Sequence, residues 1–129
     1  MHKLLTIDDS KTIRMILARA FKEYDCALIE AANGEEGLKA AAEHKPDLII
    51  LDITMPQMDG LQMLTLLRER GDNTPVIMLT AEGGSTSMEK ASHLGISDYI
   101  NKPFQNEAIV AKVQKILPLT KKELIPAAG

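Results

Sequence analysis

The stretch Leu48-Ile49-Ile50-Leu51-Asp52 is an uninterrupted apolar run that ends in a carboxylate. Val76-Ile77-Met78-Leu79-Thr80 repeats this pattern and again ends in a polar residue. A strand that is apolar on both faces belongs in the interior of a sheet that helices cover on both sides. The two stretches therefore predict central strands of a parallel sheet.

Three further short apolar runs, which start near residues 3, 26 and 98, complete a set of five. A longer segment with helical periodicity follows each run, which predicts five strand-helix units. Strands joined through helices run parallel, so the sequence predicts an open α/β sheet, whereas a barrel would need about eight units. Polar residues within Cys26-Ala27-Leu28-Ile29-Glu30 and Asp98-Tyr99-Ile100-Asn101 place these two strands at the sheet edges.

Helical spacing of apolar residues and N-terminal capping signals mark the helices. The spacing in the first, third and fifth helices is carried by Ile13, Ile16, Leu17, Ala20 and Tyr24, by Leu61, Leu64 and Leu67, and by Ile109, Val113, Ile116 and Leu117. Helix starts are predicted at Asn33-Gly34-Glu35-Glu36, Asp59-Gly60-Leu61-Gln62 and Thr86-Ser87-Met88-Glu89. We expect one domain over residues 1–119 and a short frayed tail over residues 120–129.

The composition argues against several classes of protein. The 129 residues include 15 Lys and Arg and 18 Asp and Glu, with a formal net charge of -3 and without the long basic runs of a nucleic-acid or membrane-surface binder. The single cysteine, Cys26, excludes an intrachain disulfide. No stretch approaches the roughly 18 apolar residues of a membrane span. We therefore expect a cytoplasmic chain that binds neither nucleic acid nor membranes.

Charged and polar residues close four of the five apolar runs. They are Asp8-Asp9, Asp52, Thr80 and Asn101-Lys102-Pro103. Taken singly, each has a plain alternative: a helix cap, a turn, a strand-end hydroxyl or a surface charge. Ligands in open parallel sheets bind beyond the carboxyl ends of the strands, so all of these side chains are expected at one edge. Three carboxylates there repel one another and require a compensating cation.

The predicted cluster suits phosphoryl transfer. Lys102 supplies one positive charge, and oxygen-only ligands indicate that a divalent ion supplies the rest, with Mg²⁺ favoured and Mn²⁺ or Ca²⁺ also compatible. The metal and Lys102 would neutralise phosphoryl oxygens, while Thr80 donates a hydrogen bond. A carboxylate then attacks in line as the nucleophile, and the predicted product is an aspartyl phosphate.

The same residues resemble a known family, the receiver domain of two-component response regulators. The resemblance spans residues 3 to about 117, and its four segments occur in the order and spacing of the family. These segments are Leu5-Thr6-Ile7-Asp8-Asp9-Ser10, Leu51-Asp52-Ile53-Thr54-Met55-Pro56-Gln57-Met58-Asp59-Gly60, Leu79-Thr80-Ala81 and Tyr99-Ile100-Asn101-Lys102-Pro103-Phe104. The resemblance implies that residues 1–119 form a receiver domain with a flavodoxin-like, doubly wound fold of strand order 2-1-3-4-5.

The resemblance also implies roles for the acidic residues. Asp52 matches the phosphoacceptor, which takes its phosphoryl group from the phosphohistidine of a sensor histidine kinase or of a phosphotransfer protein. Asp8 and Asp9 match the acidic pair of the magnesium site. In the family Asp9 and Asp52 would be direct ligands and Asp8 would act largely through water. The backbone carbonyl of Thr54 matches the third protein ligand.

A switch is implied by three further residues. Lys102 matches the residue that contacts the phosphate, and its peptide bond to Pro103 is expected to be cis. If Thr80 moves toward the phosphate, Tyr99 can rotate inward and alter the surface of the fourth helix, fifth strand and fifth helix. That face is the expected docking surface for a downstream target protein. The plain alternative for Tyr99 is an edge-strand aromatic that covers the fourth helix.

We expect the chain to be a monomer. Its biological role could be that of either of two branches of the family. Asp8-Asp9-Ser10-Lys11-Thr12-Ile13-Arg14 resembles the chemotaxis branch, whose single-domain members bind the flagellar switch. The segment Gly84-Ser85-Thr86-Ser87-Met88 lacks the paired lysines of the best-known motor binder, which leaves a phosphorelay shuttle as the alternative. With the receiver occupying nearly all of the sequence, the signal is expected to leave through a protein partner.

Two other classes are disfavoured. A phosphatase that forms an aspartyl phosphate in turnover usually carries Asp-x-Asp after the first strand, whereas Asp8 and Asp9 are adjacent. We therefore expect no enzyme beyond Mg²⁺-dependent self-phosphorylation and self-dephosphorylation. A flavin carrier would need a Ser/Thr/Gly phosphate loop and aromatic stackers, and the chain has only two Tyr, two Phe and no Trp.

Overall fold

Strands and helices alternate from residue 2 to residue 116 in a computed structural model, which describes residues 2–81 and 85–122. The strands are β1 (His2–Ile7), β2 (Cys26–Ala31), β3 (Leu48–Asp52), β4 (Val76–Thr80) and β5 (Asp98–Asn101). The helices are α1 (Lys11–Ala20), α2 (Gly34–His44), α3 (Gly60–Glu69), α4 (Ser85–Leu94) and α5 (Asn106–Ile116). In the described part of the chain, no helix combines the length and apolar character that crossing a membrane requires.

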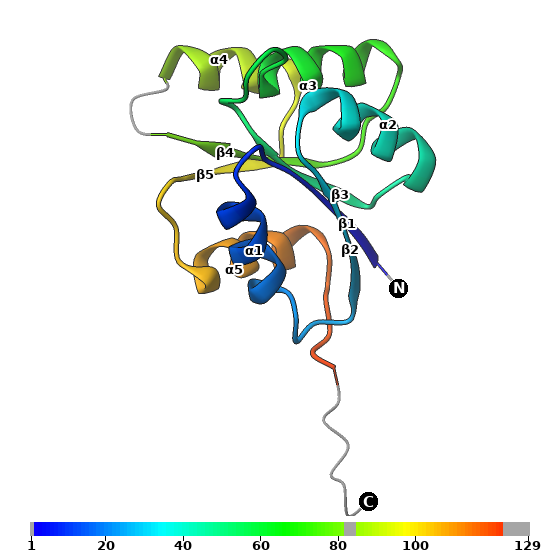
Figure 1. Ribbon diagram of the computed structural model, residues 1–129, viewed down its shortest axis with the longest axis vertical. Helices are drawn as coiled ribbons and strands as arrows, with labels where there is room; N and C mark the ends of the chain where they lie inside the picture. The colour runs from blue at the N-terminus through cyan, green and yellow to red at the C-terminus, as the bar shows by residue number, and fades with distance from the viewer. Residues whose placement is uncertain (1, 82–84, 123–129) are drawn as a thin grey trace, which may run out of the picture.

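One parallel sheet of order β2-β1-β3-β4-β5 forms the centre of the molecule. Helices α2, α3 and α4 cover one face, and α1 and α5 cover the other (Figure 1). The predicted flavodoxin-like fold is therefore confirmed, as are β2 and β5 as edge strands. Every residue of β3 and β4 is buried, as their uninterrupted apolar runs predicted.

Alternating strand residues supply two separate cores. Leu4 packs with Leu17 of α1 and Val113 of α5, whereas its neighbour Leu5 packs with Leu64 of α3 on the opposite face. Because side chains of a strand point alternately to the two faces, consecutive apolar residues of a central strand can serve both cores at once. The sheet is thereby held between two apolar layers, and its strand ends are fixed in register.

Two of the three predicted helix starts are confirmed. The Asn33 side chain accepts a hydrogen bond from the Glu36 backbone N–H at 2.8 Å at the start of α2. Asp59 and Gln62 form a reciprocal capping box at the start of α3, with bonds of 2.8 and 2.9 Å. Each side-chain oxygen satisfies a backbone donor that the first helical turn leaves unpaired.

Two helix boundaries differ from the prediction. Helix α4 already begins at Ser85, so Thr86 lies inside the helix and is not its N-cap. Its side chain lies outside the described part of the chain. Helix α1 ends at Ala20, so Tyr24 is beyond the helix although it packs against the same core. Helical spacing places a residue on the correct face but does not show where the backbone leaves the helix.

The expectation of a frayed tail from residue 120 onward is wrong for residues 120–122. The Asp25 N–H donates to the Thr120 carbonyl at 2.7 Å, the Lys122 N–H donates to the Glu23 carbonyl at 2.6 Å, and an antiparallel bridge joins Tyr24 and Lys121. Backbone hydrogen bonds need no apolar pattern, which is why composition did not indicate this pairing. Residues 123–129 of the predicted tail lie outside the described residues.

Arg68 joins the C-terminal ends of α3 and α4. Its guanidinium donates to the carbonyls of Leu94 at 3.1 Å, Gly95 at 2.7 Å and Asp72 at 2.8 Å. Burial lowers the pKa of this guanidinium, although Asp72 opposes the effect. One side chain thus satisfies carbonyls at the end of α4 and in the connection from α3 to β4.

Arg68→Met is expected to lower the free energy of unfolding by about 2–4 kcal/mol, because three charge-assisted hydrogen bonds to backbone carbonyls are lost together. The measurement is urea unfolding followed by circular dichroism. Arg70→Met is the matched control, since among the described residues the exposed Arg70 guanidinium bonds only to the Leu38 carbonyl, at 3.2 Å. Its effect should stay within about 0.5 kcal/mol. Equal effects of the two substitutions would contradict the role given to Arg68.

Candidate functional site

Four of the residues predicted for the site meet at the carboxyl edge of the sheet. Asp8 follows β1, Asp52 ends β3, and Lys102 follows β5. One carboxylate oxygen from each of Asp8, Asp9 and Asp52 lies within 4.8 Å of the other two. Asp8 and Asp52 are buried and Asp9 is exposed. The sheet therefore assembles the three carboxylates from two different strand ends, as the topology predicted.

Asp8 does not serve as a helix cap. Ser10 is the N-cap of α1, and its side chain accepts a hydrogen bond from the Ile13 N–H at 3.3 Å. The Asp8 carboxylate instead accepts the Ser10 N–H at 2.9 Å and the Lys102 ammonium at 3.1 Å. The plain alternative for Asp8 is thus excluded, and its carboxylate belongs to the cluster.

Lys102 is a member of the cluster and not a surface charge. Its Nζ lies 3.0 Å from Asp52 Oδ1 and 3.1 Å from Asp8 Oδ2. The Lys102 N–H donates to the Thr80 carbonyl at 2.8 Å, which continues the pairing of β4 and β5 past the strand end. The peptide bond between Lys102 and Pro103 is cis, as expected. One ammonium therefore bridges two strand ends.

Burial sets the charge balance of the site. The pKa of Asp52 is raised to about 6, because burial and the neighbouring Asp8 raise it by more than the Lys102 ammonium and the Thr54 N–H lower it. Burial by itself would lower the pKa of Lys102, but the bonds to Asp52 and Asp8 outweigh it and raise that pKa. Burial is therefore the main cause of the shift at Asp52, whereas the two neighbouring carboxylates cause the shift at Lys102.

The donor set fits a divalent metal ion. Three carboxylates and one ammonium leave two negative charges, and the converging atoms are oxygens, which hard cations prefer. Among the described residues, Asp8, Asp9 and Asp52 form the only group of His, Cys, Asp or Glu with this convergence. The N–H of Thr54 donates to Asp52 Oδ1 at 3.3 Å. The Thr54 carbonyl as a ligand stays a prediction.

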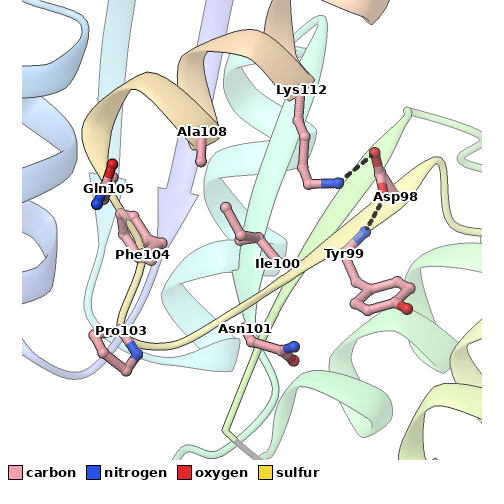
Figure 2. A pocket seen from close by; sticks show the side chains of 9 residues that line it. All are labelled: Asp98, Tyr99, Ile100, Asn101, Pro103, Phe104, Gln105, Ala108 and Lys112. Carbon is pink, nitrogen blue, oxygen red and sulfur yellow. Dashed lines mark hydrogen bonds and ion pairs between the residues drawn. The ribbon is translucent and has the colours of Figure 1, made fainter.

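Thr80 and Tyr99, the two residues of the predicted switch, differ in how far they are buried. Thr80 is buried at the end of β4, and its hydroxyl donates to the Ala81 carbonyl at 2.9 Å. Tyr99 is 46% exposed on β5 and points away from Ile100, the next residue along the strand (Figure 2). The switch itself stays a prediction, and the structure shows only that the Tyr99 side chain is exposed.

A hollow of about 450 Å³ lies beside Tyr99 on the face formed by β5 and α5. Phe104 and Ile100 provide apolar lining, and Lys112 pairs with Asp98 at 3.1 Å on one side of the hollow (Figure 2). Burial would raise the pKa of Asp98, but hydrogen bonds from the Tyr99 N–H and from Lys112 more than offset burial and lower it. The predicted docking face is thus partly apolar with a charged border.

Gly60 is a site residue whose role sequence reasoning missed. A Cβ at this position would overlap the backbone carbonyl oxygen of Asp52 and would lie 2.8 Å from Ile53 Cα. The Gly60 N–H donates to the Ile53 carbonyl at 2.7 Å. The start of α3 therefore packs directly on the backbone of Asp52. The only sequence signal was a glycine within a capping sequence, which does not reveal a close approach.

Residues 4–114 match the family described as "Response regulator receiver domain". The chain belongs to this receiver-domain family. The resemblance inferred from the four segments is therefore confirmed.

Individual relatives agree with this assignment. The transcriptional regulatory protein SrrA of Staphylococcus aureus (strain NCTC 8325 / PS 47) is 38% identical over 119 residues, which are 92% of this chain and 49% of that protein. This receiver domain thus spans about half the length of the curated relatives that it matches.

Solved receiver structures share the fold. Chemotaxis protein CheY4 of Vibrio cholerae superposes with a TM-score of 0.84 at 30% identity, covering 91% of this chain and 99% of that one. The receiver domain of Francisella response regulator 1452 gives 0.83 at 31% identity, covering 90% and 96%.

Without divalent ions, Asp52→Asn is expected to be more stable than the wild type at pH 7, by about 1–3 kcal/mol. The folded chain keeps the Asp52 proton up to a pKa of about 6, whereas the unfolded chain releases it near 3.8. Wild-type stability therefore falls as the pH rises from about 4 to about 6, and the neutral Asn escapes this loss. Urea unfolding in chelator at both pH values measures the difference. A gain of equal size at pH 4 and pH 7 would contradict the assigned cause.

Proposed function

We propose that this chain is a phosphorylation-controlled switch in which Asp52 accepts a phosphoryl group from the phosphohistidine of a sensor histidine kinase or phosphotransfer protein. One observation carries the proposal: a buried carboxylate lies 3.0 Å from a lysine ammonium and within 4.8 Å of two further carboxylates. Membership of the receiver family supports the same partners. The lone Cys26, which forms no intrachain disulfide, supports the cytoplasm as the compartment.

The hydrogen bonds indicate which oxygen attacks. Asp52 Oδ1 receives both the Lys102 ammonium and the Thr54 N–H, so among the described residues Oδ2 is the oxygen without a protein donor. In the proposed step Oδ2 forms a bond to phosphorus while the bond between phosphorus and the histidine nitrogen breaks. The imidazole leaves as the other product. Lys102 then neutralises a phosphoryl oxygen instead of the free carboxylate.

The metal ligands are proposed to be the carboxylates of Asp9 and Asp52 and the backbone carbonyl of Thr54. Asp8 would act through water, because both of its carboxylate oxygens already accept hydrogen bonds from the protein. Mg²⁺ is the proposed ion, and when bound it supplies positive charge beside the phosphoryl oxygens.

The proposed chemistry stops at self-phosphorylation and self-dephosphorylation. A phosphatase acting on external esters needs an acid that protonates the leaving group. Asp8 is unsuited to that task because its carboxylate is buried and bound to Lys102 and the Ser10 N–H. The adjacent Asp9 is exposed and belongs to the proposed metal site. The geometry thus supports a switch in preference to a phosphatase.

The proposed output is binding of a downstream protein on the face of α4, β5 and α5, by a chain acting as a monomer. A chemotaxis-type role is supported by the similarity to CheY4, a chemotaxis protein that the chain covers to 99%. The similarity to SrrA, a transcriptional regulatory protein, favours control of transcription as a second candidate. A phosphorelay shuttle is the remaining alternative, and it predicts transfer of the phosphoryl group onward to a phosphotransfer protein.

Incubation with acetyl phosphate and Mg²⁺ should add one phosphoryl group to the wild-type chain, detected by intact mass spectrometry. Asp52→Asn should show no adduct because the nucleophile is gone. Asp59→Asn is the matched control, since Asn remains a good N-cap for α3 and the loop stays in place. A full adduct on Asp52→Asn, or an adduct that persists in chelator, would overturn the proposed site and its metal requirement.

Tyr99→Ala should abolish the increase in target affinity that phosphorylation produces, while phosphorylation of Asp52 itself continues. The reason is that the exposed ring is the proposed link between Thr80 and the docking face. Calorimetric titration of the target with phosphorylated and unphosphorylated chains gives the ratio of the two affinities. The coupling through Tyr99 is refuted if the variant keeps the wild-type ratio.

A further inference from the structure

Arg14 connects the loop of Asp8 and Asp9 to the edge strand β2. It lies in the first half of α1, and its side chain is only 16% exposed. Its Nη1 donates to the backbone carbonyl of Asp8 at 2.6 Å, and its Nε pairs with Glu30 Oε1 at 3.2 Å. Side chains on a helix lean toward its N-terminus, so a residue at this position reaches back over the loop that follows β1.

The Asp8 carbonyl is a group that the sheet does not satisfy. The Asp8 N–H still donates to the Ala31 carbonyl at 3.1 Å, but β1 ends at Ile7 and the chain turns toward α1. With Arg14 on the carbonyl, Ser10 on Oδ1 and Lys102 on Oδ2, every polar atom of Asp8 is held. The backbone leading into Asp9 is therefore fixed in place.

Glu30 makes this arrangement compatible with a cation nearby. A lone guanidinium beside the acidic cluster would repel a metal ion, whereas the pair of Arg14 and Glu30 adds no net charge. The glutamate also holds the second edge of the guanidinium, which fixes its plane. Arg14 thus donates a hydrogen bond to the Asp8 carbonyl without competing with the ion for the carboxylates.

We propose that Arg14, held by Glu30, is a positioning residue that keeps Asp8 and Asp9 in the geometry that binds Mg²⁺. The inference rests on the proposed function, because it concerns the same metal site. The proposal predicts the direction in which Mg²⁺ affinity changes when Arg14 is replaced. Removing a nearby positive charge should tighten Mg²⁺ binding if the guanidinium acts only through its charge, whereas it should weaken binding if Arg14 acts by positioning.

The test is calorimetric titration of the unphosphorylated chain with Mg²⁺. Arg14→Met should bind Mg²⁺ about tenfold more weakly, the lower end of the range for outer partners of metal ligands. Arg14→Lys keeps the charge but cannot donate to the Asp8 carbonyl and Glu30 with the same rigid fork, so it should also bind more weakly. Arg70→Met, which removes a guanidinium bonded to the Leu38 carbonyl away from the acidic cluster, should match the wild type.

Thermal unfolding without metal establishes that each variant is folded, and Arg14→Lys serves the test if Arg14→Met does not fold. Unchanged or tighter binding by Arg14→Met, or wild-type affinity of Arg14→Lys, overturns the positioning role while the proposed function stands. If the wild type itself binds no Mg²⁺, the proposed metal site and the inference built on it both fail. Weaker binding by both variants, with Arg70→Met unchanged, supports the inference.

Discussion

The ion pairs of Lys102 with Asp8 and Asp52 are the interaction on which this structure depends. They join the ends of β5, β1 and β3, although these segments are far apart in the sequence. Two buried carboxylates so near each other are costly to keep ionised, and one ammonium offsets only part of that cost. The remaining deficit of positive charge is what makes the site receptive to a cation.

Most of the fold followed from the pattern of apolar residues. The runs in β3 and β4 have no polar interruption, so they fit only the interior of a sheet covered on both faces, and burial of every residue there agrees. The polar residues of β2 and β5 placed them at the edges. Because the strands run parallel, Asp8, Asp52 and Lys102 could be predicted to lie at one edge of the sheet from the order of the elements alone.

Other features could not be predicted because they depend on backbone groups. Arg14 and Arg68 both bind main-chain carbonyls, and nothing in the sequence marks which carbonyls a fold leaves unsatisfied. The same holds for Thr120, whose carbonyl accepts a hydrogen bond although its segment reads as a polar tail. Gly60 is similar, since only the packing of α3 on the backbone of Asp52 shows that there is no room for a Cβ at this position.

The hydrogen bonds of the Arg68 guanidinium also have a consequence for α4, because they fix one end of that helix. Because the carbonyls of Leu94 and Gly95 are bonded to Arg68 of α3, we expect the C-terminal end of α4 to act as the pivot in any rotation of this helix. A rotation about that point displaces Ser85, at the opposite end of the helix, more than any other residue of α4. Ser85 is also the residue of α4 that is nearest in the sequence to Thr80 of the predicted switch, whereas the bonded end of the helix is the farthest from it.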